Sequence, residues 1–79
     1  MADIISPLPG MFYASPGPDK EPFVTVGDRV EAGQAVGLIE VMKQFTEIRS
    51  EVSGVVESIA IADGAAVAPG TVLMTVTEG

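Results

Sequence analysis

A repeated glycine motif constrains the fold of this chain more than any other feature. The stretch Gly27-Asp-Arg-Val30-Glu-Ala-Gly33 matches Gly64-Ala-Ala-Val67-Ala-Pro-Gly70 after a shift of 37 residues. Further upstream, Gly10-Met-Phe-Tyr-Ala14 matches Gly54-Val-Val-Glu-Ser58 after a shift of 44 residues. The two halves are therefore one motif used twice, and the seven-residue difference between the shifts (44 − 37) marks an insertion in the first half.

Short apolar segments separated by glycine and proline predict an all-β fold. Valine, isoleucine and threonine recur at short spacing between these turn formers. Because neither half can cover its own apolar face, we expect the halves to pack on each other as a flattened barrel or sandwich with pseudo-twofold symmetry. The pattern predicts strands at residues 4–13, 23–26, 35–42, 44–50, 54–61 and 71–77.

The insertion consists of residues 15–21, Ser-Pro-Gly-Pro-Asp-Lys-Glu. These polar and turn-forming residues offer no core side chain, so we expect a loop that protrudes from the body. The 79 residues suffice for one small domain, and we expect a single domain spanning residues 1–79.

The composition excludes several classes of function. The chain has no cysteine and no histidine, which removes the thiolate and imidazole metal ligands and the usual proton shuttle. A net charge of −7 opposes nucleic acid and anionic membrane surfaces. No apolar stretch approaches the roughly 20 residues of a membrane span, and the first residues lack the features of a signal peptide. We expect a soluble chain that binds neither nucleic acid nor membrane and has no catalytic activity of its own.

A single lysine lies where two predicted strands meet. If residues 35–42 pair directly with residues 44–50, Met42 and Lys43 become the two central residues of a tight hairpin. Such turns require positive φ at one or both central positions, at a cost of about 1 to 3 kcal/mol for each strained residue. A locally disfavoured pair at a hairpin tip indicates selection for something besides folding.

The repeat also predicts where this lysine lies. A shift of 37 residues carries Lys43 to position 80, so the hairpin corresponds to the chain ends of the other half. We therefore expect Lys43 and the termini at opposite poles. An amine at one pole and a tether at the other suit an attachment point on a carrier.

The residues around this lysine resemble a known family. Glu40-Val41-Met42-Lys43 resembles the biotin attachment motif of biotin carboxyl carrier proteins, where Ala or Val and then Met precede the modified lysine. The resemblance to the carrier subunit of multisubunit acetyl-CoA carboxylase covers nearly the whole chain, in the blocks Ser6-Pro-Leu-Pro-Gly-Met-Phe-Tyr13, Ser15-Pro-Gly-Pro-Asp19, Phe23-Val-Thr-Val-Gly27 and Ser53-Gly-Val-Val56. It implies two antiparallel four-stranded sheets and a thumb, formed by the insertion, beside the biotin.

The resemblance also implies roles for particular residues. Biotin would be amide-linked to Lys43, Met42 and Val41 would set the tip, and Glu40 would contact the ligase. The thumb would be built from Ser15, Pro16, Pro18 and Asp19.

The partners that the resemblance implies are enzymes. A biotin protein ligase attaches biotin, biotin carboxylase adds a carboxyl group with ATP and bicarbonate, and carboxyltransferase passes it to acetyl-CoA for fatty acid synthesis. The domain contributes position and effective concentration rather than bond making. The expected compartment is a bacterial-type cytoplasm, with a plastid or mitochondrial origin left open.

Two alternatives remain open at this stage. A lipoyl carrier shares the architecture, although lipoyl motifs usually place Asp before the lysine and Ala after it. An unmodified β domain serving as an adaptor would tolerate replacement of Lys43. The chain also departs from the family pattern at Gln44, where Met or Leu is frequent, and at Ala68, where many carriers have Glu. Because that glutamate helps ligase recognition in some members of the family, we expect Ala68 to slow modification by a foreign ligase.

Overall fold

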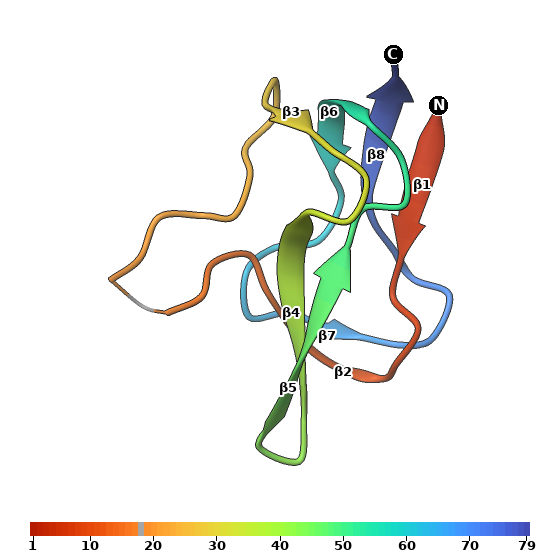
Figure 1. The fold of residues 1–79 in the computed structure, drawn as a ribbon. Helices are drawn as coiled ribbons and strands as arrows, with labels where there is room; N and C mark the ends of the chain where they lie inside the picture. The colour runs from red at the N-terminus through yellow and green to blue at the C-terminus, as the bar shows by residue number, and fades with distance from the viewer. Residues whose placement is uncertain (18) are drawn as a thin grey trace.

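Eight short strands form the fold (Figure 1). The structure is a computed structural model, and it describes residues 1–17 and 19–79. Pro18, expected in the thumb, lies outside the described residues. The strands are β1 (Ala2–Ile5), β2 (Gly10–Tyr13), β3 (Arg29–Val30), β4 (Ala35–Val41), β5 (Gln44–Arg49), β6 (Gly54–Ile59), β7 (Ala66–Val67) and β8 (Val72–Glu78).

The strands build two antiparallel four-stranded sheets, with orders β1-β8-β6-β3 and β5-β4-β2-β7. The second order follows from the first when each strand is exchanged with its repeat mate: β1 with β5, β8 with β4, β6 with β2 and β3 with β7. Each half of the chain therefore contributes strands to both sheets. The predicted two-sheet, pseudo-twofold, all-β architecture is confirmed.

Two of the predicted strands are wrong. The range 4–13 is two strands rather than one, because Pro7 and Pro9 have no N–H to donate to a ladder. The Ser6 hydroxyl donates to the Leu8 carbonyl at 2.7 Å, which turns the chain between β1 and β2. Residues 23–26 form no strand, since the Phe23 N–H closes a loop on the Ala14 carbonyl at 2.9 Å instead.

The turns repeat as closely as the strands do. The Gly33 N–H donates to the Ser50 carbonyl at 2.7 Å, and the Gly70 N–H donates to the Ser6 carbonyl at 2.9 Å. Both serines are buried, and the hydroxyl of each donates to a carbonyl two residues ahead, so neither is left unsatisfied. Four motif glycines have the left-handed φ that these turns require: Gly27, Gly33, Gly64 and Gly70.

The core lies between the sheets and is itself built from repeat mates. Residues paired by the shifts of 37 or 44 are buried together: Val30 with Val67, Val36 with Leu73, Ile39 with Val76, Phe12 with Val56 and Ile4 with Ile48. The largest asymmetry is Phe12, whose ring overlaps the space that a Cβ on Gly37 would occupy. The mate of Gly37 is the buried Met74, and the mate of Phe12 is Val56. The large Phe12 and the small Gly37 of one half therefore correspond to two residues of intermediate size in the other.

The two ends of the chain lie at one pole and the β4–β5 hairpin at the other (Figure 1). Strand β1 pairs with β8 through Ala2 and Val76, which holds the termini side by side. This arrangement confirms the predicted opposition of the hairpin tip and the termini. Among the described residues, no helix is long and apolar enough to cross a membrane.

Candidate functional site

The hairpin tip has the strained geometry that the sequence predicts. Val41 and Gln44 are the last paired residues of β4 and β5, which leaves Met42 and Lys43 as a two-residue turn. Their φ angles are 52° and 67°, and they are the only non-glycine residues with positive φ among the described residues. A turn with positive φ at both central positions matches the twist of the flanking strands, yet it normally requires Asn-Gly or a similar pair.

The tip is also accessible. Met42 is 91% exposed, and Lys43 beside it is exposed as well. Of β5, only Ile48 is buried, so the hairpin extends beyond the core. No carboxylate of the described residues forms an ion pair with Lys43, whereas Arg29 and Arg49 are both paired. Lys43 therefore presents an amine that a partner can reach from several sides.

An aromatic face lies beside the tip on the outer side of β2, β4 and β5. Tyr13 lies opposite Leu38, and Glu40 lies opposite Phe45. The rings of Tyr13 and Phe45 have centroids 6.2 Å apart and are tilted by 50°, a favourable aromatic geometry. The Tyr13 hydroxyl donates to Glu40 Oε1 at 2.8 Å. Glu40 thus has one carboxylate oxygen engaged within the domain, and its contact with a ligase stays a prediction.

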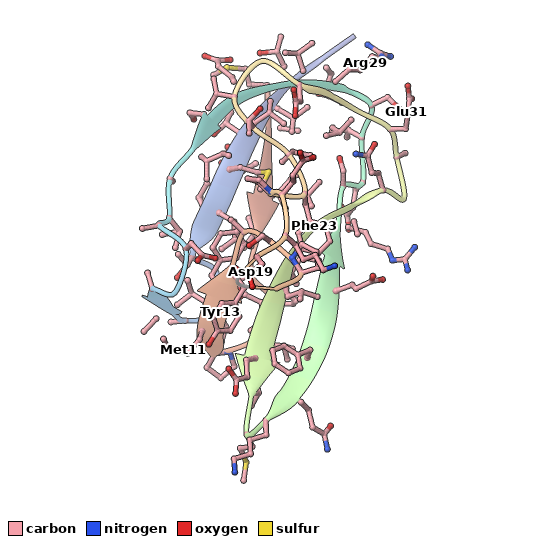
Figure 2. All side chains as sticks on the ribbon, turned by 90° about the vertical axis from the view of Figure 1, so that its left-hand side faces the viewer. Met11, Tyr13, Asp19, Phe23, Arg29 and Glu31 are labelled. Atoms are coloured by element: carbon pink, nitrogen blue, oxygen red, sulfur yellow. The ribbon has the colours of Figure 1, made fainter. Side chains whose placement is uncertain are left out.

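The base of the thumb covers one side of this face. The segment from β2 to β3 extends away from the body (Figure 1), and Figure 2 looks onto this side. Between thumb and sheet lies a cavity of about 280 Å³. It is lined by Tyr13, Ser15, Pro16, Gly17, Leu38, Phe45 and Asp63. Ser15 and Pro16 from the predicted thumb meet this cavity, whereas Asp19 is outside its lining.

The second half of the chain serves as an internal comparison for this face. Where the Tyr13 hydroxyl donates to Glu40, the Thr77 hydroxyl donates to the Glu57 carboxylate at 2.6 Å. The matched positions for Tyr13, Leu38 and Glu40 are all polar, namely Glu57, Thr75 and Thr77. At the Tyr13, Leu38 and Glu40 positions, the aromatic and apolar character therefore belongs to the half that carries the thumb, and Phe45 of β5 completes the face from the other half.

Sequence reasoning missed the residues that line the cavity from the sheet and from the opposite turn: Tyr13, Leu38, Phe45 and Asp63. One available signal was the repeat itself. At the shift of 44, Tyr13 corresponds to Glu57, so the first half has an aromatic residue where the second half has a polar surface residue. A residue that breaks an otherwise well-kept repeat is a candidate for function.

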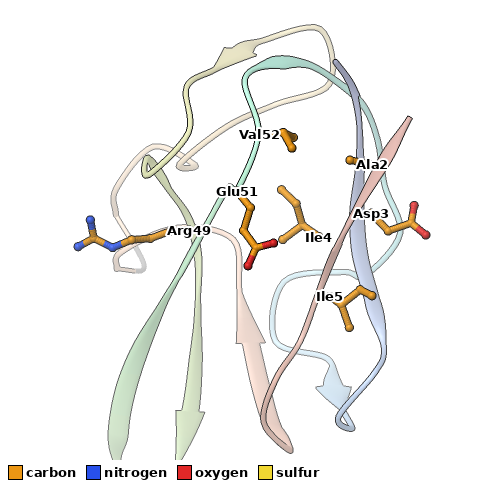
Figure 3. A pocket seen from close by; sticks show the side chains of 7 residues that line it. All are labelled: Ala2, Asp3, Ile4, Ile5, Arg49, Glu51 and Val52. Carbon is orange, nitrogen blue, oxygen red and sulfur yellow. The ribbon is translucent and has the colours of Figure 1, made fainter. Parts of the chain in front are cut away.

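A second cavity, of about 180 Å³, lies between β1 and the segment after β5 (Figure 3). Its lining includes Ile4, Ile5, Arg49 and Glu51. The Arg49 guanidinium points away from it in Figure 3 and pairs with Glu47 at 2.6 Å. Since β1 and β5 are edge strands of different sheets, this cavity is the seam between the sheets, away from the hairpin tip.

The hydrogen bond to Glu40 raises the pKa of Tyr13 above its ordinary value of 10.0, with burial and the charges of Glu40 and Asp63 acting in the same direction. Because the pKa is raised on folding, the stabilisation is complete below the pKa of the unfolded chain and is lost as the pH rises through the folded value. We expect the tyrosinate absorbance of the folded protein to appear at higher pH than that of the denatured protein. Tyr13 is the only tyrosine and the chain has no tryptophan, so the signal is specific.

Glu40→Gln should bring the Tyr13 titration midpoint down toward that of the denatured chain, because it removes the negative acceptor. Glu57→Gln is the matched control on the other half and should leave the midpoint unchanged. A folded wild-type midpoint at or below the denatured one would contradict the hydrogen bond.

Comparison with known proteins agrees with this geometry. The family model described as "Biotin-requiring enzyme" matches residues 2–76. The chain is 46% identical over 71 residues to the biotin carboxyl carrier protein of acetyl-CoA carboxylase 2, chloroplastic, of Arabidopsis thaliana, which covers 90% of this chain and 28% of the relative. The carrier protein of Pyropia yezoensis is 45% identical over 75 residues, covering 95% and 48% of the two chains.

A bacterial relative is similar to the same degree. The biotin carboxyl carrier protein of acetyl-CoA carboxylase of Haemophilus influenzae is 45% identical over 62 residues, covering 78% of this chain and 40% of the relative. The chain spans less than half the length of these three relatives. These relatives are named as carrier proteins, and they include chloroplast and bacterial forms. Since the family model spans nearly the whole chain, the chain belongs to the biotin and lipoyl domain family of biotin-requiring enzymes.

Proposed function

We propose that this domain carries biotin in amide linkage to the Nζ of Lys43, as the carrier domain of an acetyl-CoA carboxylase. The observation that carries the proposal is the exposed amine at the second position of a strained two-residue turn, with φ of 67°, at the pole opposite both termini. The relatives, which are biotin carboxyl carrier proteins of acetyl-CoA carboxylase, support the choice of biotin and of this carboxylase.

The tip fits the chemistry of attachment. The unprotonated Nζ of Lys43 attacks the carbonyl carbon of a biotin carboxyl group that a biotin protein ligase has activated as a mixed anhydride with AMP. The C–N amide bond forms, the C–O bond to the phosphate breaks, AMP leaves, and the amine proton passes to solvent. Met42 and Val41 hold the acceptor in a fixed turn, which reduces the conformations that the ligase must select.

The surroundings of the tip fit the attached group. Bound biotin supplies a ureido nitrogen that takes up and releases a carboxyl group. The cavity of about 280 Å³ offers the aromatic faces of Tyr13 and Phe45 on one side and the thumb residues Ser15 and Pro16 on the other. Apolar walls with a few polar groups are typical of small-molecule sites. The cavity therefore gives the ring a resting place beside the thumb, where Asp19 and Pro18 are also expected to contribute.

The partners follow from this role. A biotin protein ligase, with Glu40 as a contact, modifies Lys43; biotin carboxylase loads the carrier and carboxyltransferase unloads it onto acetyl-CoA. The domain supplies no catalytic group, only a tethered position and a high effective concentration. A net charge of −7 favours partner surfaces rich in Lys and Arg. A bacterial cytoplasm or a plastid is the compartment that the relatives support.

Co-expression with a biotin protein ligase tests the proposal. We expect the wild-type domain to give an avidin-blot signal and an intact mass increased by one biotinyl group. Lys43→Arg keeps the charge and most of the length of the side chain but lacks a nucleophilic amine, so its signal should be absent. Lys20→Arg is the matched control, because Lys20 is the only other lysine, and it should be modified like wild type.

Three results would contradict this proposal. A modified Lys43→Arg variant would show that the acceptor lies elsewhere. A mass increase that fits a lipoyl group on material expressed with both ligases would change the cofactor. Unmodified material from the native source would favour the adaptor role.

A further inference from the structure

The thumb is fastened at its root by a residue that is distant in sequence. Ala14 follows β2 directly, and its carbonyl accepts from the Phe23 N–H at 2.9 Å, which closes the loop at residues 15–22. The Ala14 N–H donates to Asp63 Oδ1 at 2.7 Å, across 49 positions of sequence. Both backbone polar groups of Ala14 are therefore engaged, one of them by a side chain from the opposite turn.

Asp63 is held in place by backbone hydrogen bonds between the residues that follow it and Phe12 of β2. The neighbouring Gly64 donates its N–H to the Phe12 carbonyl at 2.6 Å, and the Phe12 N–H donates to the Ala65 carbonyl at 2.9 Å. The backbone N–H groups of Phe12 and Ala14 point to the same side of β2, because alternate residues of a strand direct their backbone groups the same way. The Asp63 carboxylate thus takes the place of a further strand carbonyl at the point where β2 ends and the thumb begins.

The repeat separates this contact from ordinary turn chemistry. The mate of Asp63 in the other half is Val26, which is 61% exposed and offers no side-chain acceptor. The mate of Ala14 is Ser58, and no insertion follows Ser58. In the turn that contains Val26, Asp28 accepts from the Thr25 N–H at 2.9 Å, which is a local contact within the turn. Among the described residues, a carboxylate therefore accepts from a backbone N–H outside its own turn only at the root of the thumb.

We propose that Asp63 is a positioning residue for the biotin site: its carboxylate fixes the root of the thumb and so sets the width of the cavity between the thumb and the Tyr13–Phe45 face. Asp63 lines this cavity together with Ser15, Pro16 and Gly17. The part of the proposal that concerns biotin rests on the proposed function, whereas the fastening of the thumb does not.

Amide hydrogen exchange measured by NMR on the full chain tests the fastening. Asp63→Val is the informative variant, because valine occupies the matched turn of the other half and is compatible with its backbone. We expect the Ala14 amide to exchange about tenfold faster, since it loses a charge-assisted hydrogen bond. Asp63→Asn keeps an acceptor oxygen and should restore slow exchange. Asp28→Ala, the matched control, removes an equally exposed carboxylate and should leave Ala14 unchanged.

The core amides of β8 report whether each variant is folded, and Asp63→Ala replaces the valine variant if that one is not. Unchanged exchange at Ala14 without the carboxylate would overturn the proposal. Exchange in Asp63→Asn as fast as in Asp63→Val would overturn it too, because a general disturbance of the turn rather than a lost acceptor would then be the cause.

An avidin blot of the same samples after ligase treatment separates this proposal from the proposed function. We expect Asp63→Val to be modified at Lys43 like wild type, because the hairpin tip is unaltered. Faster Ala14 exchange with no avidin signal in any sample, wild type included, would remove the biotin role and leave the thumb anchor. An avidin signal with unchanged Ala14 exchange would support the biotin role and overturn the proposal that Asp63 fastens the thumb.

Discussion

Gly54→Ala is expected to abolish cooperative folding. A Cβ at this position would overlap the backbone carbonyl oxygen of Thr77 on the adjacent strand β8, and it would lie 2.8 Å from the Thr77 carbonyl carbon. Neither atom belongs to a flexible side chain, so β6 and β8 would have to separate at the end of their ladder where Gly54 pairs with Glu78. A domain of this size has a free energy of unfolding of only about 4 to 12 kcal/mol. Because Gly54 also pairs with Val30 of β3, the clash disturbs both ladders of β6, at a cost comparable with the whole of that stability.

Thermal unfolding followed by circular dichroism measures this effect. Gly17→Ala is a suitable control, because Gly17 lies in the thumb, lacks a positive φ and has only the flexible Lys20 Cγ, at 3.3 Å, near an added Cβ. We expect the control to unfold within a few degrees of wild type. A cooperative transition near the wild-type temperature in Gly54→Ala would show that the two strands can separate at little cost.

The double substitution Met42→Asn and Lys43→Gly should stabilise the domain and eliminate its acceptor. Both positions have positive φ, and Asn-Gly is the favoured pair for a turn of this type. Relief of the two strained residues is expected to raise the free energy of unfolding by about 2 kcal/mol. The midpoint of urea unfolding should therefore rise, with an unchanged slope. The avidin-blot signal should disappear, because no amine remains at the tip.

Met42→Asn alone separates the two effects, since it relieves one strained residue and keeps Lys43. We expect about half of the stabilisation, and Lys43 stays available as an acceptor. A double variant no more stable than wild type would mean that the Met-Lys turn carries no strain, and the argument that selection at the tip opposed stability would then fail.

The architecture was predictable from the repeat, whereas the shortest strands were not. A period of glycine motifs is visible without knowledge of pairing, and it led to two interlocked halves. Strands β3 and β7 have two residues each and are defined by their partners β6 and β2 rather than by a pattern of their own. Residues 23–26 have the composition of a strand but serve loop closure through Phe23, and their mates at 60–63 form no strand either.

The candidate site divides in the same way. Lys43, Met42 and Val41 followed from local turn chemistry, since the need for positive φ depends only on the hairpin register. The aromatic face required the register between β2, β4 and β5, which places Phe45 near Tyr13 although 32 positions (45 − 13) separate them. The contact of Asp63 with Ala14 joins two turns through a side chain and has no periodic signal at all.

The pairing of the first strand with the last has a consequence during protein synthesis. Because β1 is bonded only to β8, and β6 lies between β8 and β3, the sheet that contains them cannot close on a nascent chain before residues 72–78 have emerged from the ribosome. The β4–β5 hairpin is local and emerges earlier, but an isolated hairpin is at best marginally stable in water. The turn that presents Lys43 therefore reaches its final form only after residues 72–78 have emerged. A modifying enzyme that recognises this turn passes over products that are truncated before those residues.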